Sequence, residues 1–141
     1  LPDLLARNGW KDPIVGRFVI DGWAIVSEKN PEQHLNGHAN AVLVGGRDGD
    51  LHDRLLSAYA AAGFTAIDAA GRPDLGGTDP RNIVNRTFHL RGAQLEMTTP
   101  LREAMFEVFT AAQRKHTATE MFWQFVAATR QALAGRTATS E

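Results

Sequence analysis

The sequence predicts an α/β domain in which helices flank a mixed sheet. Short apolar runs that end at glycine or at Asp-Gly alternate with segments whose apolar residues recur at helical spacing. The chain has 141 residues and is 43% hydrophobic, which is enough to close one core. We therefore expect residues 1–141 to form a single α/β domain.

A β-hairpin is predicted near the N-terminus. Apolar runs at residues 18–20 and 23–26 flank Asp21-Gly22, and such a pair between apolar runs favours a two-residue turn. Residues 27–40 are polar and contain proline and glycine, so we expect a long exposed loop there.

A strand–helix–strand unit is predicted next. The β-branched run at 42–44 stops at Gly45-Gly46, helical spacing follows over 51–62, and residues 64–67 form a second strand-like run. Asp48 or Asp50 is expected to cap the helix, and Gly63 is expected to end it. A crossover of this kind places its two strands parallel in one sheet.

The C-terminal part is predicted to add two extended segments and two helices. Ile83-Val84 and residues 93–97 are the extended segments, and we expect the sheet to continue through both. Thr98 or Thr99 is expected to cap a helix with Pro100 at its first position. Its apolar side is expected to consist of Leu101, Met105, Phe106, Val108 and Phe109. A last helix is expected from about residue 119 to residue 134.

Composition excludes several classes of partner. Fifteen Lys and Arg residues against sixteen Asp and Glu residues leave a formal net charge of −1, so no overall positive field attracts nucleic acid or an anionic membrane. No apolar run approaches the ~20 residues that span a bilayer, and no export signal is visible, so we expect a soluble protein. Cysteine is absent, so a metal site would need His, Asp or Glu ligands.

Asn85-Arg86 is an unusual end for a segment that is otherwise apolar. The Asn85 amide and the Arg86 guanidinium together could hold a substrate carboxylate, because the guanidinium fork matches the two carboxylate oxygens. The alternative is a structural arginine paired with Asp68, Asp74 or Asp79. Residue types and spacing leave both interpretations open.

Glu96 is the candidate general base. It lies between Leu95 and Met97, so on a strand its side chain faces away from theirs, either into solvent or into a cleft. Only a cleft suits a base, and a solvated strand carboxylate is the alternative. Arg102, one turn into the following helix, could pair with Glu96 and would then favour its ionised form. It is also a candidate substrate-binding residue.

Gly45-Gly46 is interpreted as a tight turn before a capped helix. Two glycines after a strand also occur in phosphate-binding loops, where backbone N–H groups approach the ligand. The sequence around them lacks both the spacing and the lysine of such loops. A small phosphate-binding protein therefore remains only a minor alternative.

The five histidines give no clear metal site. His34 and His38 lie four residues apart, which would direct both to one metal on a helix, but Asn36-Gly37 between them interrupts helical geometry. At most one of the two is a candidate ligand. The other three are expected to be surface or hydrogen-bonded histidines: His52, His89 and His116.

Taken together, several of these segments resemble the phage-type poly-γ-glutamate hydrolases. The similarity covers roughly residues 37–134, follows that family's order, and is most specific in its second half. The segments that carry it are Val42-Leu43-Val44-Gly45-Gly46-Arg47-Asp48, Gly63-Phe64, Asn82-Ile83-Val84-Asn85-Arg86, Gln94-Leu95-Glu96 and Leu101-Arg102.

The resemblance implies a fold similar to part of a zinc carboxypeptidase, with one zinc held by two histidines and a glutamate. It implies that Glu96 is the base and that Asn85 with Arg86 binds a carboxylate of the polymer. The family's N-terminal zinc-ligand motif has no counterpart before Val42, so the resemblance also implies that residues 1–141 are a truncated or reduced form of a larger catalytic domain. Asn36-Gly37 occupies the place of a later His-Gly pair, unless His34 or His38 takes that role.

The expected function is that of a zinc-dependent amidohydrolase acting on poly-γ-glutamate or a similar acidic peptide. The resemblance also implies a cytoplasmic protein or one released with phage. The alternative is a non-catalytic relative, or a fragment, that binds an acidic peptide or protein partner without metal. Nucleic acid and membrane are not expected partners.

Overall fold

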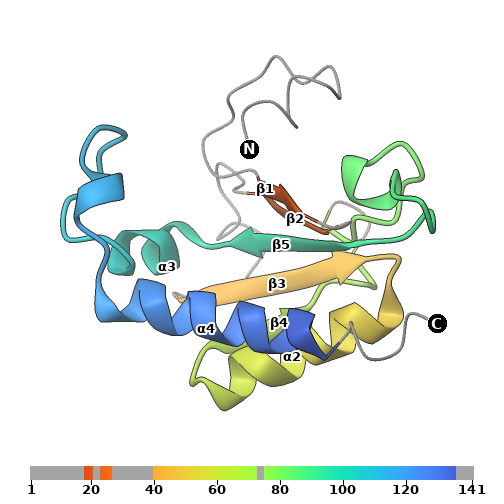
Figure 1. Ribbon diagram of the computed structural model, residues 1–141, viewed down its shortest axis with the longest axis horizontal. Coiled ribbons are helices and arrows are strands. Elements are labelled where there is room, and N and C mark those ends of the chain that lie inside the picture. The colour runs from red at the N-terminus through yellow and green to blue at the C-terminus, as the bar shows by residue number, and fades with distance from the viewer. Residues whose placement is uncertain (1–17, 21–22, 27–39, 73–74, 136–141) are drawn as a thin grey trace.

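The computed structural model describes residues 18–20, 23–26, 40–72 and 75–135, and it contains a five-stranded mixed sheet (Figure 1). The strand order is β1-β2-β5-β3-β4. The strands are β1 (Phe18–Ile20), β2 (Trp23–Val26), β3 (Ala41–Gly46), β4 (Thr65–Asp68) and β5 (Ala93–Met97). The predicted fold class, a mixed sheet flanked by helices, is confirmed.

Strand pairing follows the predicted local units. β1 and β2 are antiparallel with Ile20 opposite Trp23, as expected of a hairpin, and the predicted turn residues Asp21-Gly22 lie outside the described residues. β3 and β4 are parallel, as expected of a strand–helix–strand crossover. β5 joins the two units, because it runs parallel to β2 on one side and antiparallel to β3 on the other.

Three α-helices are described: α2 (Gly49–Ala61), α3 (Thr99–Ala104) and α4 (Glu120–Ala134). Asp48 caps α2 by accepting a hydrogen bond from the backbone N–H of Leu51. Thr98 caps α3, and its Oγ1 also accepts from the N–H of Ala41 at 3.1 Å, which ties the helix to β3. None of the helices in the described ranges is long and apolar enough to cross a membrane.

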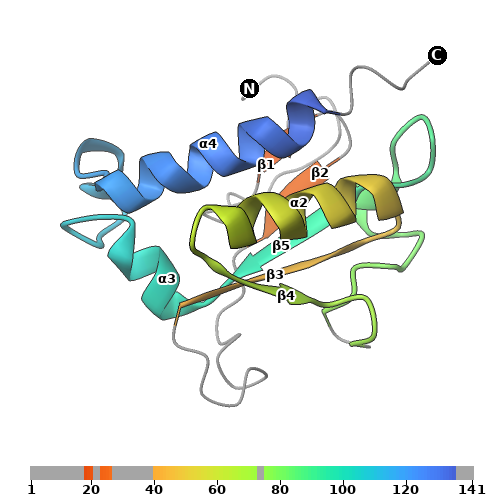
Figure 2. The ribbon, with the colours of Figure 1, turned by 90° about the horizontal axis from the view of Figure 1, so that it is seen from below.

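The main core lies between one face of the sheet and the pair α2 and α4, which run side by side in Figure 2. At its centre the Tyr59 and Phe125 rings stack with centroids 4.6 Å apart, and the Tyr59 hydroxyl shares a 2.7 Å hydrogen bond with Thr129 Oγ1. Fully buried strand and helix side chains complete this core: Val42, Val44, Leu51, Leu55, Leu95 and Leu101.

Two element predictions were wrong. Ile83-Val84 is not a strand, because Asn82 Oδ1 accepts from the N–H of Val84 and starts a short 3-10 helix, η2 (Ile83–Asn85). The helix after Thr98 ends at Ala104 instead of continuing, since Phe106 forms an isolated antiparallel bridge with Ala118. A second 3-10 helix, η3 (Arg114–His116), lies before α4.

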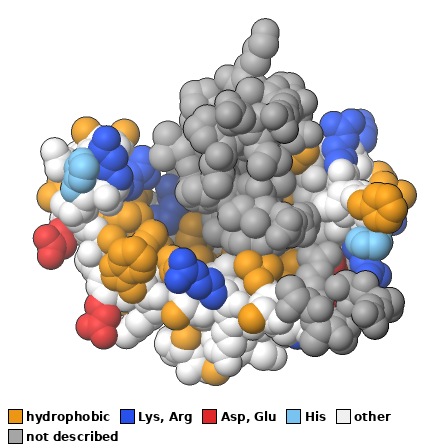
Figure 3. Space-filling view, in the orientation of Figure 1, with side chains coloured by type: hydrophobic (Ala, Val, Ile, Leu, Met, Phe, Trp, Pro, Cys, Tyr) orange, Lys and Arg blue, Asp and Glu red, His pale blue; other side chains and the backbone are white. Residues whose placement is uncertain are grey.

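Large apolar side chains also reach the surface. Hydrophobic side chains gather towards opposite ends of the face seen in Figure 3. Phe88 and Leu90, in the segment before β5, are 93% and 66% exposed, and Val108 and Trp123 are 42% and 60% exposed. The segment between η2 and β5 therefore presents its apolar residues to solvent.

Candidate functional site

β5 presents different chemistry to the two faces of the sheet. Leu95 and Met97 belong to the core under α2 and α4. Gln94 and Glu96 alternate with them and so face the other way. On that second face the register partner of Glu96 on β3 is Leu43, which packs in a separate small apolar cluster. Glu96 is only 5% exposed, so it is not the solvated strand carboxylate that was the alternative.

A chain of side-chain amides reaches the Glu96 carboxylate. Gln94 Nε2 donates to Glu96 Oε1 at 2.6 Å, and Asn82 Nδ2 donates to Gln94 Oε1, also at 2.6 Å. Asn82 is the N-cap of η2, so these bonds join the strand to the segment that covers its polar face. Glu96 therefore lies at the end of an ordered polar network.

Glycines allow the segment after β4 to lie directly on β3. A Cβ at Gly45 would stand 2.5 Å from the carbonyl oxygen of Gly76, and the N–H of Gly46 donates to that oxygen at 2.7 Å. Gly46 also has a φ of +101°, which favours glycine. Gly45-Gly46 is therefore a strand end against which a second backbone packs, and not only a tight turn.

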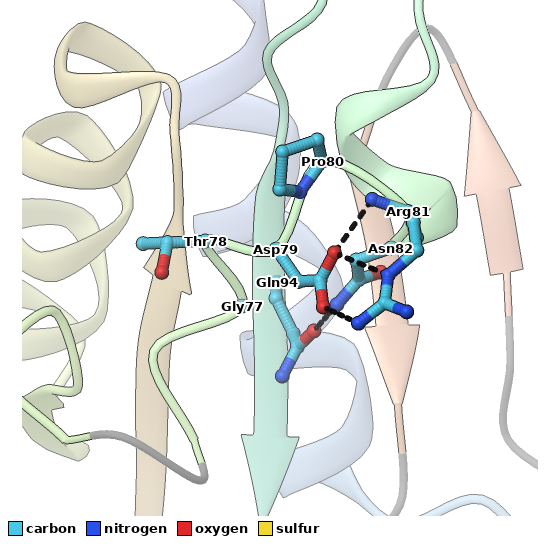
Figure 4. Close-up of a pocket in the computed structure, with 7 residues that line it drawn as sticks. All are labelled: Gly77, Thr78, Asp79, Pro80, Arg81, Asn82 and Gln94. Atoms are coloured by element: carbon cyan, nitrogen blue, oxygen red, sulfur yellow. Dashed lines mark hydrogen bonds and ion pairs between the residues drawn. The ribbon is translucent and has the colours of Figure 1, made fainter.

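An open pocket of about 730 Å³ lies beside this network (Figure 4). Residues 77–82 and Gln94 line it. Within it, Arg81 holds Asp79 through two side-chain bonds of 2.8 and 3.1 Å, and these bonds lower the pKa of Asp79 to about 2. The pocket thus has the amides of Asn82 and Gln94 in its wall and a neutralised ion pair at its rim.

Asn85 is buried, 1% exposed, and holds the loop together. Its Nδ2 donates to the carbonyl oxygens of Gly77 and Asp79 at 2.7 and 3.0 Å. Both N–H bonds of the amide are therefore used by the backbone, and its Oδ1 has no hydrogen-bond partner among the residues that the structure describes. In this conformation Asn85 has no free donor for a carboxylate, so its binding role stays a prediction.

Arg86 is exposed at the C-cap of η2. Of the structural partners considered from the sequence, Asp79 pairs with Arg81 and Asp68 pairs with His52, while Asp74 lies outside the described residues. Among the residues that the structure describes, no hydrogen bond or ion pair engages the Arg86 side chain. Its backbone follows η2, the short helix whose N-cap Asn82 contacts Gln94.

Arg102 is partly buried in α3. Its Nη2 donates to Thr99 Oγ1 at 2.8 Å, and its guanidinium carbon lies 5.9 Å from the centroid of the Phe109 ring. These contacts anchor the arginine to its own helix and to the segment that follows. Its predicted part in substrate binding is not tested by them.

The described histidines behave as expected from the sequence. His52 is buried on α2, and its ring nitrogens each lie 2.9 Å from a carboxylate oxygen, one of Asp53 and one of Asp68. Burial lowers the pKa of His52, but the hydrogen bonds and charges of the two aspartates outweigh it and raise the pKa above its usual value. His89 and His116 are exposed.

No metal site is formed by the described part of the chain. Within it, no three His, Asp or Glu side chains come close enough to hold an ion. The two candidate ligands from the sequence, His34 and His38, lie outside the described residues. The residues described therefore do not fit a complete zinc site.

Comparison with known proteins decides the family. The model of the poly-γ-glutamate hydrolase family matches residues 33–128. The chain belongs to this family. The match includes both the segment that carries Asn85 and Arg86 and the strand that carries Glu96, in agreement with the resemblance seen in the sequence.

Curated relatives match about two thirds of this chain. SPbeta prophage-derived UPF0714 protein YoqZ of Bacillus subtilis (strain 168) is 33% identical over 96 residues, which make up 66% of this chain and 35% of that protein. UPF0714 protein YndL of the same organism is 31% identical over 94 residues, 64% of this chain and 37% of that protein. The family assignment thus rests on similarity along most of this chain.

Solved structures agree with the fold. A bacteriophage poly-γ-glutamate hydrolase superposes with a TM-score of 0.67 and 27% identity over 82% of this chain and 52% of that one. A structure described as zinc-free YNDL has the same TM-score at 24% identity, over 81% of this chain and 52% of that one, and it supports the fold alone. The chain spans about half of these structures and less than two fifths of the curated relatives.

Asn82 and Gln94 were not predicted from the sequence as residues of the site. Gln94 lies two residues before Glu96 on a strand, so the two side chains must share one face of the sheet. That spacing was the available signal for Gln94. No sequence signal predicted the contact between Asn82 and Gln94, because this contact depends on how the intervening loop closes.

Proposed function

We propose that this chain carries the general base of a zinc-dependent amidohydrolase that acts on poly-γ-glutamate or a similar acidic peptide. The observation that supports this best is the buried Glu96 carboxylate, oriented by Gln94 on the face of β5 that turns away from the core. A general base must be held within reach of the proton that it accepts. Family membership supplies the class of reaction.

In this proposal Glu96 accepts the proton of the water that attacks the scissile amide carbonyl. A preorganised polar network assists such a step, because the carboxylate does not have to be reoriented during the reaction. The neighbouring pocket then accommodates the part of the polymer next to the scissile bond.

Arg86 binds a polymer carboxylate in this proposal. Its exposed guanidinium is available for the bidentate pairing that suits this group. Asn85 supports it by holding the preceding loop, and would contribute a donor only if its bonds to Gly77 and Asp79 opened. Arg102 supplies a further positive charge for an acidic chain.

Zinc enters the proposal through the family resemblance. When bound, zinc polarises a carbonyl and lowers the pKa of water. The described residues do not form its site, so no step is assigned to zinc here. At most one ligand is proposed from His34 and His38.

A second candidate function is metal-independent binding of an acidic peptide through the same face. The observation that favours it is that the described part of the chain has no group of three metal-binding side chains. In that case Glu96 and Arg86 would bind or position a partner without hydrolysing it.

Incubation with poly-γ-glutamate, with and without added zinc, separates the two functions. Shortening of the polymer together with near-stoichiometric bound zinc supports the hydrolase. Glu96→Gln should then reduce turnover by about 10²-fold or more with little change in stability, whereas Glu103→Gln, an exposed glutamate of α3, should not. Binding of the polymer without shortening at any zinc concentration would support the second function.

A further inference from the structure

The amide chain that ends at Glu96 has a fixed direction. The backbone N–H of Val84 can only donate, so Asn82 must turn its Oδ1 towards it, at 3.2 Å. That leaves Asn82 Nδ2 to donate to Gln94 Oε1, and Gln94 then turns Nε2 towards Glu96. The orientation of both amides thus follows from one backbone donor, although a carboxamide by itself could be placed either way round.

Packing holds Gln94 in this position. A Cβ at Gly77 would lie 2.9 Å from Gln94 Oε1 and 3.0 Å from its Cβ and Cδ, so the loop backbone lies close against the side chain. Gly77 also has a φ of +63°. Gln94 is 6% exposed and lines the pocket together with Asn82. The Gly77 backbone therefore confines Gln94 on one side, and the hydrogen bonds to Asn82 and Glu96 hold its amide on the other.

We propose that Gln94 is a positioning residue for Glu96, and that Asn82 sets the direction in which Gln94 donates. This inference rests on the proposed role of Glu96 as general base. A donor on Oε1 orients the carboxylate and favours its ionised form. Because Asn82 begins the 3-10 helix that ends at Arg86, the same contacts connect the base to the proposed substrate-binding segment.

The residues beside Glu96 on the neighbouring strands have no titratable group that could shift its titration midpoint. Its register partners are Leu43 on β3 and Val26 on β2, neither of which carries a titratable group. In the covering loop, Asp79 and Arg81 pair with each other. Arg102 on α3 remains unchanged in every variant used below.

The test follows the ionisation of the Glu96 carboxyl by NMR in chains with ¹³C-labelled glutamate, with Glu96→Gln used to assign the signal. Gln94→Met removes the donor at similar volume, and should raise the titration midpoint of Glu96 by about one pH unit. Asn82→Ser keeps an N-cap oxygen for Val84 but loses the donor to Gln94. It should raise the Glu96 midpoint by about half as much as Gln94→Met does, although neither Gln94 nor Glu96 is substituted in this variant.

Gln124→Met is the matched control. Gln124 Nε2 lies 3.4 Å from Glu120 Oε1 on the exposed surface of α4, so the same kind of pair is broken away from the site. This variant should leave the Glu96 midpoint where it is. A purely structural role of Gln94 would lower the melting temperature of Gln94→Met without moving that midpoint.

The readout does not depend on hydrolysis, so the two proposals fail separately. An unmoved midpoint in Gln94→Met overturns the positioning role, whatever the turnover, and Asn82→Ser decides in the same way if Gln94→Met does not fold. A raised midpoint in a chain that hydrolyses nothing supports the positioning role and counts against the proposed function. If the wild-type chain is active, the acid limb of the pH–rate profile should lie at higher pH in Gln94→Met and in Asn82→Ser than in the wild type.

Discussion

The two faces of the sheet are closed in different ways, although the same strands build both. On one face Val42, Leu95 and Met97 pack under α2 and α4, and the contacts are almost all apolar. On the other face Gln94 and Glu96 lie under a glycine-rich loop and a 3-10 helix. A small apolar cluster around Leu43 packs there, and hydrogen bonds join amides, a carboxylate and backbone.

The difference shows that β5 contributes side chains to an apolar core and to a polar network at once. Because side chains alternate along a strand, each residue type is assigned to one face by its position. Substitutions of buried apolar side chains and of the glycines in close backbone contact should therefore act on unfolding. Substitutions of polar side chains on the loop-covered face should act mainly on binding, ionisation or turnover. The following predictions test that separation.

The largest effect is expected on the helix-covered face. Leu95→Ala removes a fully buried side chain, and should lower the free energy of unfolding by about 2–5 kcal/mol through lost burial and the remaining cavity. Denaturant unfolding measures it. The same substitution at Leu90, which is 66% exposed, is the control and should cost less than about 0.5 kcal/mol. Similar losses at both positions would contradict the core assignment.

A smaller effect is expected where the loop lies on β3. Gly45→Ala places a Cβ against the carbonyl oxygen of Gly76, a backbone atom, so the loop must move. We expect a loss of about 1–3 kcal/mol in the free energy of unfolding. Gly49→Ala, at the start of α2, meets no atom within 4 Å and should be neutral or slightly stabilising. Equal stability of the two variants would show that the loop does not pack as described.

Arg86→Lys should separate binding from stability. The substitution keeps the positive charge but loses the bidentate fork, so binding of a γ-glutamyl oligomer should weaken by about tenfold. Because Arg86 is exposed, the melting temperature should hardly change. Calorimetric titration and thermal melting of one preparation measure both, with Arg130→Lys on the exposed side of α4 as the control. A fall in melting temperature that accompanies the loss of binding would mark Arg86 as structural.

The smallest effect concerns His52, which joins α2 to the end of β4. Its pKa is raised in the folded chain, so its stabilising contribution is complete below the unfolded pKa of about 6.5 and is lost as pH rises through the higher folded pKa. The pKa of Asp68 is lowered, first by the N–H of Ala70 and then by His52.

Both aspartates are largely exposed, so solvent screening limits the contribution of His52 to at most about 1 kcal/mol. Unfolding measured from pH 5.5 to 8.5 should show stability falling with pH in the wild type, and a weaker fall in His52→Gln. An identical slope in the two proteins would remove His52 as the cause.

Local patterns predicted most of the elements, because hairpins, crossovers and helix caps depend on neighbouring residues. Only neighbouring residues were needed to predict the β1–β2 pairing from Asp21-Gly22, the helix cap at Thr98 and the strand β3. The strand prediction was wrong at Ile83-Val84. Apolar β-branched residues favour a strand there, but the side chain of the neighbouring Asn82 begins a 3-10 helix.

The sequence by itself determined that Gln94 and Glu96 share one face of β5, and that Leu95 and Met97 share the other, since this follows from the period of a strand. It also determined the order of the family's segments. Only the tertiary structure decided which face the helices cover, and that Asn82 reaches Gln94 across twelve residues. The physical reason is that alternation relates neighbours along a strand, whereas the burial of Glu96 and the direction of its donors depend on how a distant loop closes over the sheet.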